Sequence, residues 1–267
     1  MDKRSGAPGG PAFHEQGSGE TLVLIPGIQG RWEWMRPAVS ALARHFRVVT
    51  FSLLGEPGSG GRPETFDSYV EQLDAVLAAA AVERALICGV SFGGLIAVRY
   101  AAARGERVAR LVLVSTPSPG WQPDAHIHRY DTAPRSSAVA FVAGAPGRLF
   151  REISAAVPGR RRRVAALAGY VGSILGHPTL PGRMAARVKS VAGCDFAADA
   201  RRVNAPTLVV TGEAALDRVV PVQGTREYLQ LITGSVGVTL ERTGHIGLVT
   251  RPEAFADIVW RWTRSAL

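Results

Sequence analysis

The chain of 267 residues has few cysteines and no long apolar run. Its two cysteines, Cys88 and Cys194, lie far apart in the sequence. We expect free, buried thiols rather than a disulfide, which suits a reducing cytoplasm. No apolar stretch approaches the roughly 18 residues that cross a bilayer, so we expect no membrane partner. The first ten residues carry charges with no apolar segment after them, so we expect no secretory signal.

Lysine is also scarce, although the formal net charge is +9. Lys3 and Lys189 are the only lysines, and the arginines are scattered along the chain. The one basic run, Arg160–Arg163, has no interleaved aromatic residues and matches no nucleic-acid motif. We therefore expect no nucleic-acid partner and interpret the run as the solvated start of a helix. A patch that steers anionic substrates is the less favoured alternative.

Phosphate and metal motifs are missing as well. The glycine-rich stretch 54–61 lacks the Lys-Ser/Thr of a P-loop and does not match Gly-x-Gly-x-x-Gly. It is interpreted as a flexible surface turn, and no cofactor is expected. His126 and His128 lie near Asp124 and Asp131, but we interpret them as exposed loop residues, so no metal site is expected either.

The remaining pattern alternates apolar strand-like runs with helical segments, which indicates an α/β fold with a doubly wound, mostly parallel sheet. Between about residues 118 and 200 the strand-like runs disappear, and alanine-rich segments are divided by Gly and Pro. We therefore expect a core over 1–117 and 201–267, interrupted by a helical cap over 118–200. The expected strands are 13–16, 21–25, 46–51, 85–90, 108–114, 205–211 and 236–241. In the core we expect one helix that ends near residue 45 and four further helices over 68–82, 95–103, 222–231 and 252–264.

The most informative stretch is Gly89-Val90-Ser91-Phe92-Gly93-Gly94, between a buried strand and an alanine-rich helix. It fits Gly-x-Ser-x-Gly, the pattern of a nucleophile elbow. In such an elbow a strand reverses at once into a helix and holds the serine in strained backbone geometry. Glycines two residues before and after the serine avoid a Cβ clash at this turn. The alternative is a glycine-rich turn whose serine only caps the helix.

Two further strand ends supply partners for a serine nucleophile. Asp217 follows the strand expected at 205–211, and His245 follows the one expected at 236–241. Histidine, with an ordinary pKa of about 6.5, suits the role of a base, and a carboxylate holds its tautomer. The chain order Ser, Asp, His is the one expected when an elbow serine comes first.

These segments resemble the α/β-hydrolase superfamily, in the subgroup with a helical cap after the sixth core strand. The resemblance rests on Leu24-Ile25-Pro26-Gly27-Ile28, the elbow, Pro206–Glu213, Asp217–Pro221 and Gly244-His245, and covers the chain from about residue 12 onward.

The resemblance implies that Ser91 is the nucleophile, His245 the base and Asp217 the orienting acid. It also implies an oxyanion hole made by the backbone N–H groups of Phe92 and Ile28. The family commonly has His-Gly where this chain has Pro26-Gly27, which leaves Gln29 as an alternative donor. The turn before Asp217 is longer than usual, so Glu213 remains a rival acid, with Asp124 as a further one. Trp32, Trp34 and Trp121 are candidates for the pocket wall, although core or rim packing explains them equally well.

The expected function is a cofactor-independent serine hydrolase that cleaves an ester of a small-molecule substrate through an acyl-enzyme. Acyl transfer to another acceptor and carbon–carbon bond cleavage need the same three residues and stay open as alternatives. A non-catalytic ligand-binding protein on the same fold is the alternative from another class.

Overall fold

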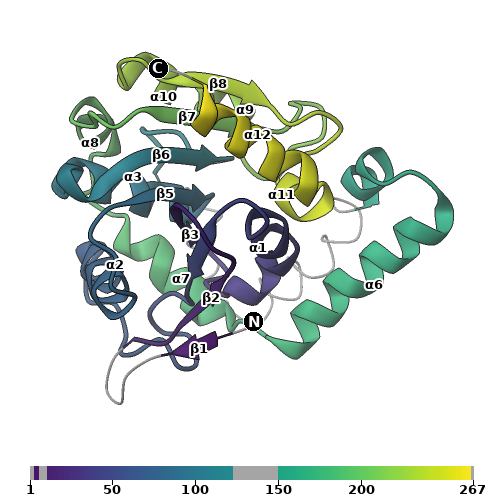
Figure 1. Ribbon diagram of the computed structural model, residues 1–267, viewed down its shortest axis with the longest axis horizontal. Helices are drawn as coiled ribbons and strands as arrows, with labels where there is room; N and C mark the ends of the chain where they lie inside the picture. Colours follow the sequence, from purple (N-terminus) through teal and green to yellow (C-terminus); the bar gives the residue numbers. More distant parts are fainter. Residues whose placement is uncertain (1–2, 6–10, 123–149, 266–267) are drawn as a thin grey trace.

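The computed structural model describes residues 3–5, 11–122 and 150–265, and Figure 1 shows a central sheet with helices around it. The described residues form one eight-stranded sheet in the order β1-β2-β4-β3-β5-β6-β7-β8. The six strands from β3 to β8 run parallel, and β2 is antiparallel to β1 and β4. The strands are β1 (Lys3–Ser5), β2 (Phe13–Gln16), β3 (Thr21–Ile25), β4 (Arg47–Thr50), β5 (Ala85–Val90), β6 (Val108–Val114), β7 (Thr207–Thr211) and β8 (Val236–Thr239).

The doubly wound sheet predicted from the sequence is confirmed. The chain leaves β3 for β4 on one side and then returns to add β5 on the other side of β3. At such a switch the loops after the two strands diverge and leave a crevice at their carboxyl ends, where ligands bind in open α/β sheets. The loops that leave β3 and β5 here begin at Pro26 and Ser91.

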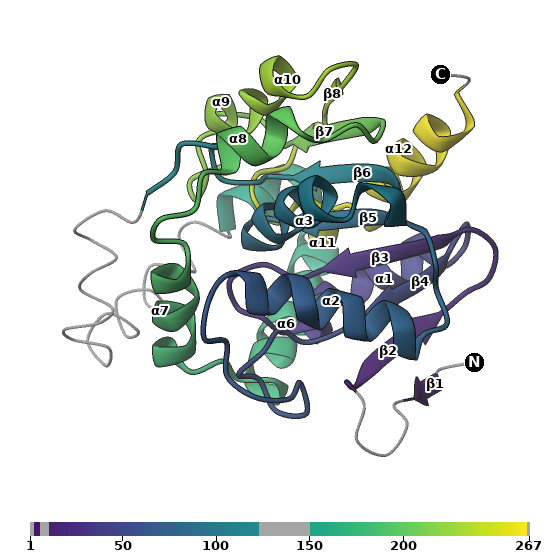
Figure 2. The same cartoon turned by 90° about the vertical axis from the view of Figure 1, so that its left-hand side faces the viewer.

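Helices cover both faces of the sheet, as Figures 1 and 2 show. One apolar core lies beneath α2 (Asp67–Ala79), α3 (Phe92–Ala103) and α8 (Phe196–Arg201). The other lies beneath α1 (Arg36–Leu42) and α12 (Pro252–Arg264). The shorter elements are η1 (Trp32–Met35), η2 (Gly105–Arg107), α9 (Val222–Arg226), α10 (Tyr228–Leu231) and α11 (Gly247–Thr250).

The segment between β6 and β7 is helical in its described part. Residues 150–156 are helical, and α6 (Arg160–Gly176), α7 (Pro181–Ser190) and α8 follow. Figure 1 shows α6 projecting away from the sheet, and Figure 2 shows α7 beyond the carboxyl ends of the strands. The arginine run begins α6 with its first three side chains exposed, which confirms the predicted solvated helix start.

Several element boundaries differ from the expected ones. The strand expected to run to Glu241 ends at Thr239. Among the described strands β8 pairs with β7 alone, and β7 ends at Thr211, which pairs with Thr239. The helix expected to begin at Leu95 begins at Phe92, because the chain enters α3 directly from the elbow. The strand β1 was not expected.

Both cysteines are free thiols, as predicted. Burial is confirmed for Cys88, which lies inside β5, but the expectation is wrong for Cys194, which is only partly buried after α7. Among the described helices, none combines the length and the apolar character that crossing a bilayer requires.

Candidate active site

The elbow places Ser91 in a strained conformation between β5 and α3. Its φ of +52° and ψ of −120° lie in a region that side-chain-bearing residues rarely adopt and that costs about 1–3 kcal/mol. A Cβ on Gly89 would lie 2.6 Å from the Cα of Gly94, and one on Gly93 would lie 2.5 Å from the carbonyl oxygen of Ile25. The glycines therefore let β5, α3 and the end of β3 approach each other closely.

The turn after β3 lies directly beside this serine. A Cβ on Gly27 would be 3.5 Å from the Cβ of Ser91. The carbonyl of Gly27 accepts a hydrogen bond of 2.8 Å from the N–H of Gly30. Because the two groups of a trans peptide unit point in opposite directions, the N–H of Ile28 points out of the turn. Phe92 is the first residue of α3, so its N–H has no helical carbonyl to bind.

Asp217 and His245 meet where the turn after β7 packs on the turn after β8. The Nδ1 of His245 lies 3.4 Å from the Oδ2 of Asp217. A Cβ on Gly244 would lie 2.5 Å from the carbonyl oxygen of Leu216, and one on Gly212 would lie 2.6 Å from that of Gly244. Glycine at these two positions therefore allows the close approach that brings imidazole and carboxylate together.

Asp217 is held as an ionised carboxylate. Burial alone would raise its pKa, but the contact with His245 and the N–H groups of Val219 and Val220 together hold the pKa below its ordinary value. Those N–H groups donate to Oδ1 at 3.0 and 2.9 Å, so Oδ2 is left for His245. The carboxylate therefore has both the charge and the orientation to fix an imidazole tautomer.

The rival acid Glu213 lies in a different environment. Its Oε1 accepts a hydrogen bond from the backbone N–H of Arg242 at the protein surface. Glu213 therefore links the turn after β7 to the turn after β8. The carboxylate that contacts the imidazole of His245 is that of Asp217. The other rival, Asp124, and the histidines at 126 and 128 with Asp131 lie outside the described residues.

A cavity of about 380 Å³ lies beside Ser91. Ser91, Ile28 and Phe92 line it together with the segment Val219–Pro221 that follows Asp217, whereas Asp217 and His245 themselves are not among its described lining residues. The rest of the described wall is apolar or small, with no charged side chain; it comprises Pro117, Ser118, Trp121, Met184, Ala185, Val188 and Gly224. Of the tryptophans considered in the sequence, Trp121 lies on this wall.

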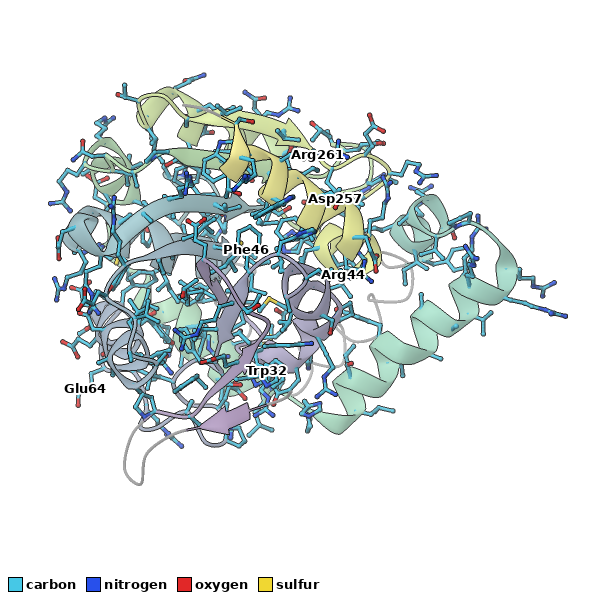
Figure 3. All side chains as sticks on the ribbon, viewed as in Figure 1. Trp32, Arg44, Phe46, Glu64, Asp257 and Arg261 are labelled. Atoms are coloured by element: carbon cyan, nitrogen blue, oxygen red, sulfur yellow. The ribbon has the colours of Figure 1, made fainter. Side chains whose placement is uncertain are left out.

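Trp32 lies elsewhere. It follows the turn after β3 in η1, and its ring stacks on His14 of β2 at a centroid distance of 4.2 Å. Figure 3 labels it in the lower part of the view. Trp34 donates from its indole Nε1 to the carbonyl of His177, after α6. Neither ring is among the described residues around the cavity.

Sequence reasoning missed Glu152, a buried carboxylate beside the histidine turn. Its Oε1 accepts from the N–H of Ile246 at 3.1 Å, and Gly244 donates to the same carboxylate. The two residues that flank His245 are therefore held by one side chain from the helical residues 150–156. Burial raises the pKa of Glu152 by more than these N–H groups lower it. No motif surrounds Glu152 in the sequence, so only the fold reveals the contact.

Glu152→Gln is expected to gain stability relative to the wild type as the pH rises from 4 to 7. Because the folded protein has the higher pKa, the unfolded chain ionises this carboxyl first, and the wild type loses stability as the pH rises. Glutamine keeps an oxygen acceptor for Ile246 without the charge. Thermal unfolding of both proteins at each pH measures the difference. An unfolding temperature of Glu152→Gln that falls relative to that of the wild type as the pH rises would contradict the assignment.

The chain is similar to known proteins in sequence and in structure. The model of a family described as alpha/beta hydrolase fold matches residues 20–252. A putative carbamate hydrolase from Caulobacter sp. (strain K31) is 28% identical over 92% of this chain and 90% of its own length. A pimeloyl-[acyl-carrier protein] methyl ester esterase from Nitrosomonas europaea is 28% identical over 90% and 94%. The crystal structure of the enol-lactonase from Burkholderia xenovorans LB400 superposes with a TM-score of 0.78 at 23% identity, covering 96% of this chain and 97% of that one.

Proposed function

Because this chain belongs to the α/β-hydrolase fold family, we propose that it is a serine hydrolase that cleaves a neutral carboxylic ester through an acyl-enzyme. The observation that carries the proposal is the strained Ser91 on the wall of an apolar cavity. The turn after β3 lies beside this serine, and the segment after Asp217 lines the same cavity. The relatives named above include a putative carbamate hydrolase and a methyl ester esterase.

In the proposed mechanism, His245 removes the proton of the Ser91 hydroxyl as its oxygen attacks the ester carbonyl. Asp217 holds the imidazole in the required tautomer and stabilises the imidazolium. The N–H groups of Ile28 and Phe92 bind the developing oxyanion, where the loss of one donor typically costs about 10²–10³ in rate. His245 then protonates the leaving alcohol and activates the water that releases the acid.

The substrate class follows from the cavity. An acyl group that enters it leaves water and meets Trp121, Met184 and Val188. Since no described side chain of the wall carries a charge, an anionic acyl group would lose its hydration without gaining a counterion. We further propose that the segment 118–200 acts as the cap that selects this group, because Met184 and Val188 lie on α7.

A matched pair of esters tests the substrate class. p-Nitrophenyl hexanoate and p-nitrophenyl hemiadipate have six-carbon acyl groups that differ by a terminal carboxylate. We expect kcat/KM to be about 10²-fold or more higher for the hexanoate, because burial of an unpaired carboxylate costs several kcal/mol. Release of p-nitrophenol at mildly alkaline pH measures both. Equal rates would contradict the neutral-substrate assignment, and turnover of neither ester would favour the non-catalytic binding protein.

A further inference from the structure

Arg187 on α7 is a fully buried cation with three acceptors around it. Its side chain is 1% exposed. The guanidinium donates to the carbonyl of Ile28 at 2.9 Å, to that of Leu54 at 3.1 Å and to the Oε1 of Glu56 at 2.7 Å. A Cβ on Gly30 would lie 2.7 Å from its Nη1, so the turn after β3 packs directly on the guanidinium.

The four carbonyls of the turn are all hydrogen-bonded. That of Gly27 binds the N–H of Gly30, and that of Gly30 binds the N–H of Leu53, both at 2.8 Å. The two between them bind side chains of the segment between β6 and β7. Arg187 binds the carbonyl of Ile28, and the Oγ1 of Thr179 donates to the carbonyl of Gln29 at 2.8 Å. The turn is therefore held from outside by the same segment that supplies a wall of the cavity.

We propose that Arg187 is a positioning residue for the oxyanion hole, which rests on the function proposed above. In a planar trans peptide, the direction of the carbonyl fixes the direction of the following N–H. Arg187 fixes the peptide unit between Ile28 and Gln29, and the Gly27–Gly30 bond fixes the unit before it. The N–H of Ile28 belongs to the unit held by the Gly27–Gly30 bond, and the Cα of Ile28 joins that unit to the one that Arg187 holds. Because both units are fixed, the N–H of Ile28 is directed at the oxyanion before the reaction begins.

Glu56 keeps the guanidinium in place. Its side chain is fully buried and pairs with Arg187, and Arg183 also contacts it, at 3.0 Å. The glycine-rich stretch 54–61, interpreted from the sequence as a flexible surface turn, thus carries a buried carboxylate. Arg183 is 30% exposed and touches the carboxylate but no carbonyl of the turn, which makes it a matched control.

The first test compares Arg187→Met with Arg183→Met on p-nitrophenyl butyrate. We expect Arg187→Met to lower kcat by about 10- to 100-fold at nearly unchanged KM. A donor that points away from the oxyanion stabilises the transition state less, but the rate loss is smaller than when the donor is removed altogether. The inhibition constant of a trifluoromethyl ketone, which forms an oxyanion with the serine, should rise by a similar factor. Arg183→Met should leave both values within about threefold. An unchanged inhibition constant in Arg187→Met would overturn the proposal.

Stability is separated from positioning by the double variant Glu56→Gln/Arg187→Met. Removal of Arg187 alone leaves a buried carboxylate with one exposed partner, so the unfolding temperature should fall. The double variant removes both charges and should recover much of that temperature, while kcat stays low because the carbonyl of Ile28 still lacks its donor. Recovery of kcat together with the unfolding temperature would show a merely structural role.

A readout that needs no activity distinguishes this proposal from the proposed function. Amide hydrogen exchange of a peptide covering residues 26–34 should be faster in Arg187→Met than in Arg183→Met or the wild type. Unchanged exchange would refute the positioning role even in an active hydrolase. Faster exchange in a protein that hydrolyses no ester would support Arg187 as the residue that holds the turn and would count against the hydrolase function alone.

Discussion

Ser91→Ala is expected to lower kcat by about 10⁶ for any ester that the wild type hydrolyses, by analogy with other serine triads. The variant loses the only atom that forms the acyl bond, while the turn after β3 and the cavity stay in place. Steady-state turnover of p-nitrophenyl butyrate measures the loss. The backbone strain at φ +52° applies to alanine as it does to serine, so the unfolding temperature should change little.

A matched control comes from the same cavity. Ser118 also lies on the wall, but its hydroxyl donates to the Oε2 of Glu227 at 2.7 Å. Ser118→Ala should therefore keep kcat within about threefold of the wild type, as expected for a residue outside the reacting group. Residual activity of Ser91→Ala within about 100-fold of the wild type would contradict the assignment, because other serine triads lose far more when the nucleophile is removed.

Asp217→Asn is expected to lower kcat by about 10⁴, the scale seen when a triad loses its carboxylate. The asparagine keeps an oxygen that accepts from Val219 and Val220, so the turn should fold as before. It presents an amide nitrogen to the Nδ1 of His245 in place of a carboxylate oxygen, which favours the wrong imidazole tautomer. Steady-state kinetics at several pH values measure the loss.

Glu213→Gln is the matched comparison, since it also removes one negative charge from the same turn. Its remaining oxygen accepts from the N–H of Arg242, so kcat should stay within about threefold of the wild type. A larger loss in Glu213→Gln than in Asp217→Asn would show that the acid has been assigned to the wrong residue.

The sheet was predictable because each buried strand is a short apolar run bounded by a turn. β3, β5 and β6 have the predicted limits, since buried parallel strands show as continuous apolar sequence. The limits of the antiparallel β2 were also predicted, although its sequence is not a continuous apolar run. The strand β1 was missed because a three-residue edge strand, Lys3–Ser5, is polar and leaves no such pattern. The end of β8 was missed because it depends on where its neighbour stops.

The candidate site was predictable where the local backbone requires glycine, because that requirement is visible in the sequence. Gly89 and Gly93 mark the elbow, and Gly244 marks the turn before His245, because a Cβ at each position would clash. Glu152 and Arg187 carry no such mark. Their importance arises from contacts between distant segments, and a charged residue among alanines looks like any solvated helix position.

The most direct measurement of the central claim is the reaction of the wild-type protein with a fluorophosphonate, followed by peptide mapping. The reagent reports an activated serine whatever the natural substrate is. We expect one adduct, on Ser91, with labelling lost in Ser91→Ala and slowed in Asp217→Asn. No adduct, or an adduct that stays in Ser91→Ala, would contradict a nucleophilic serine at this elbow.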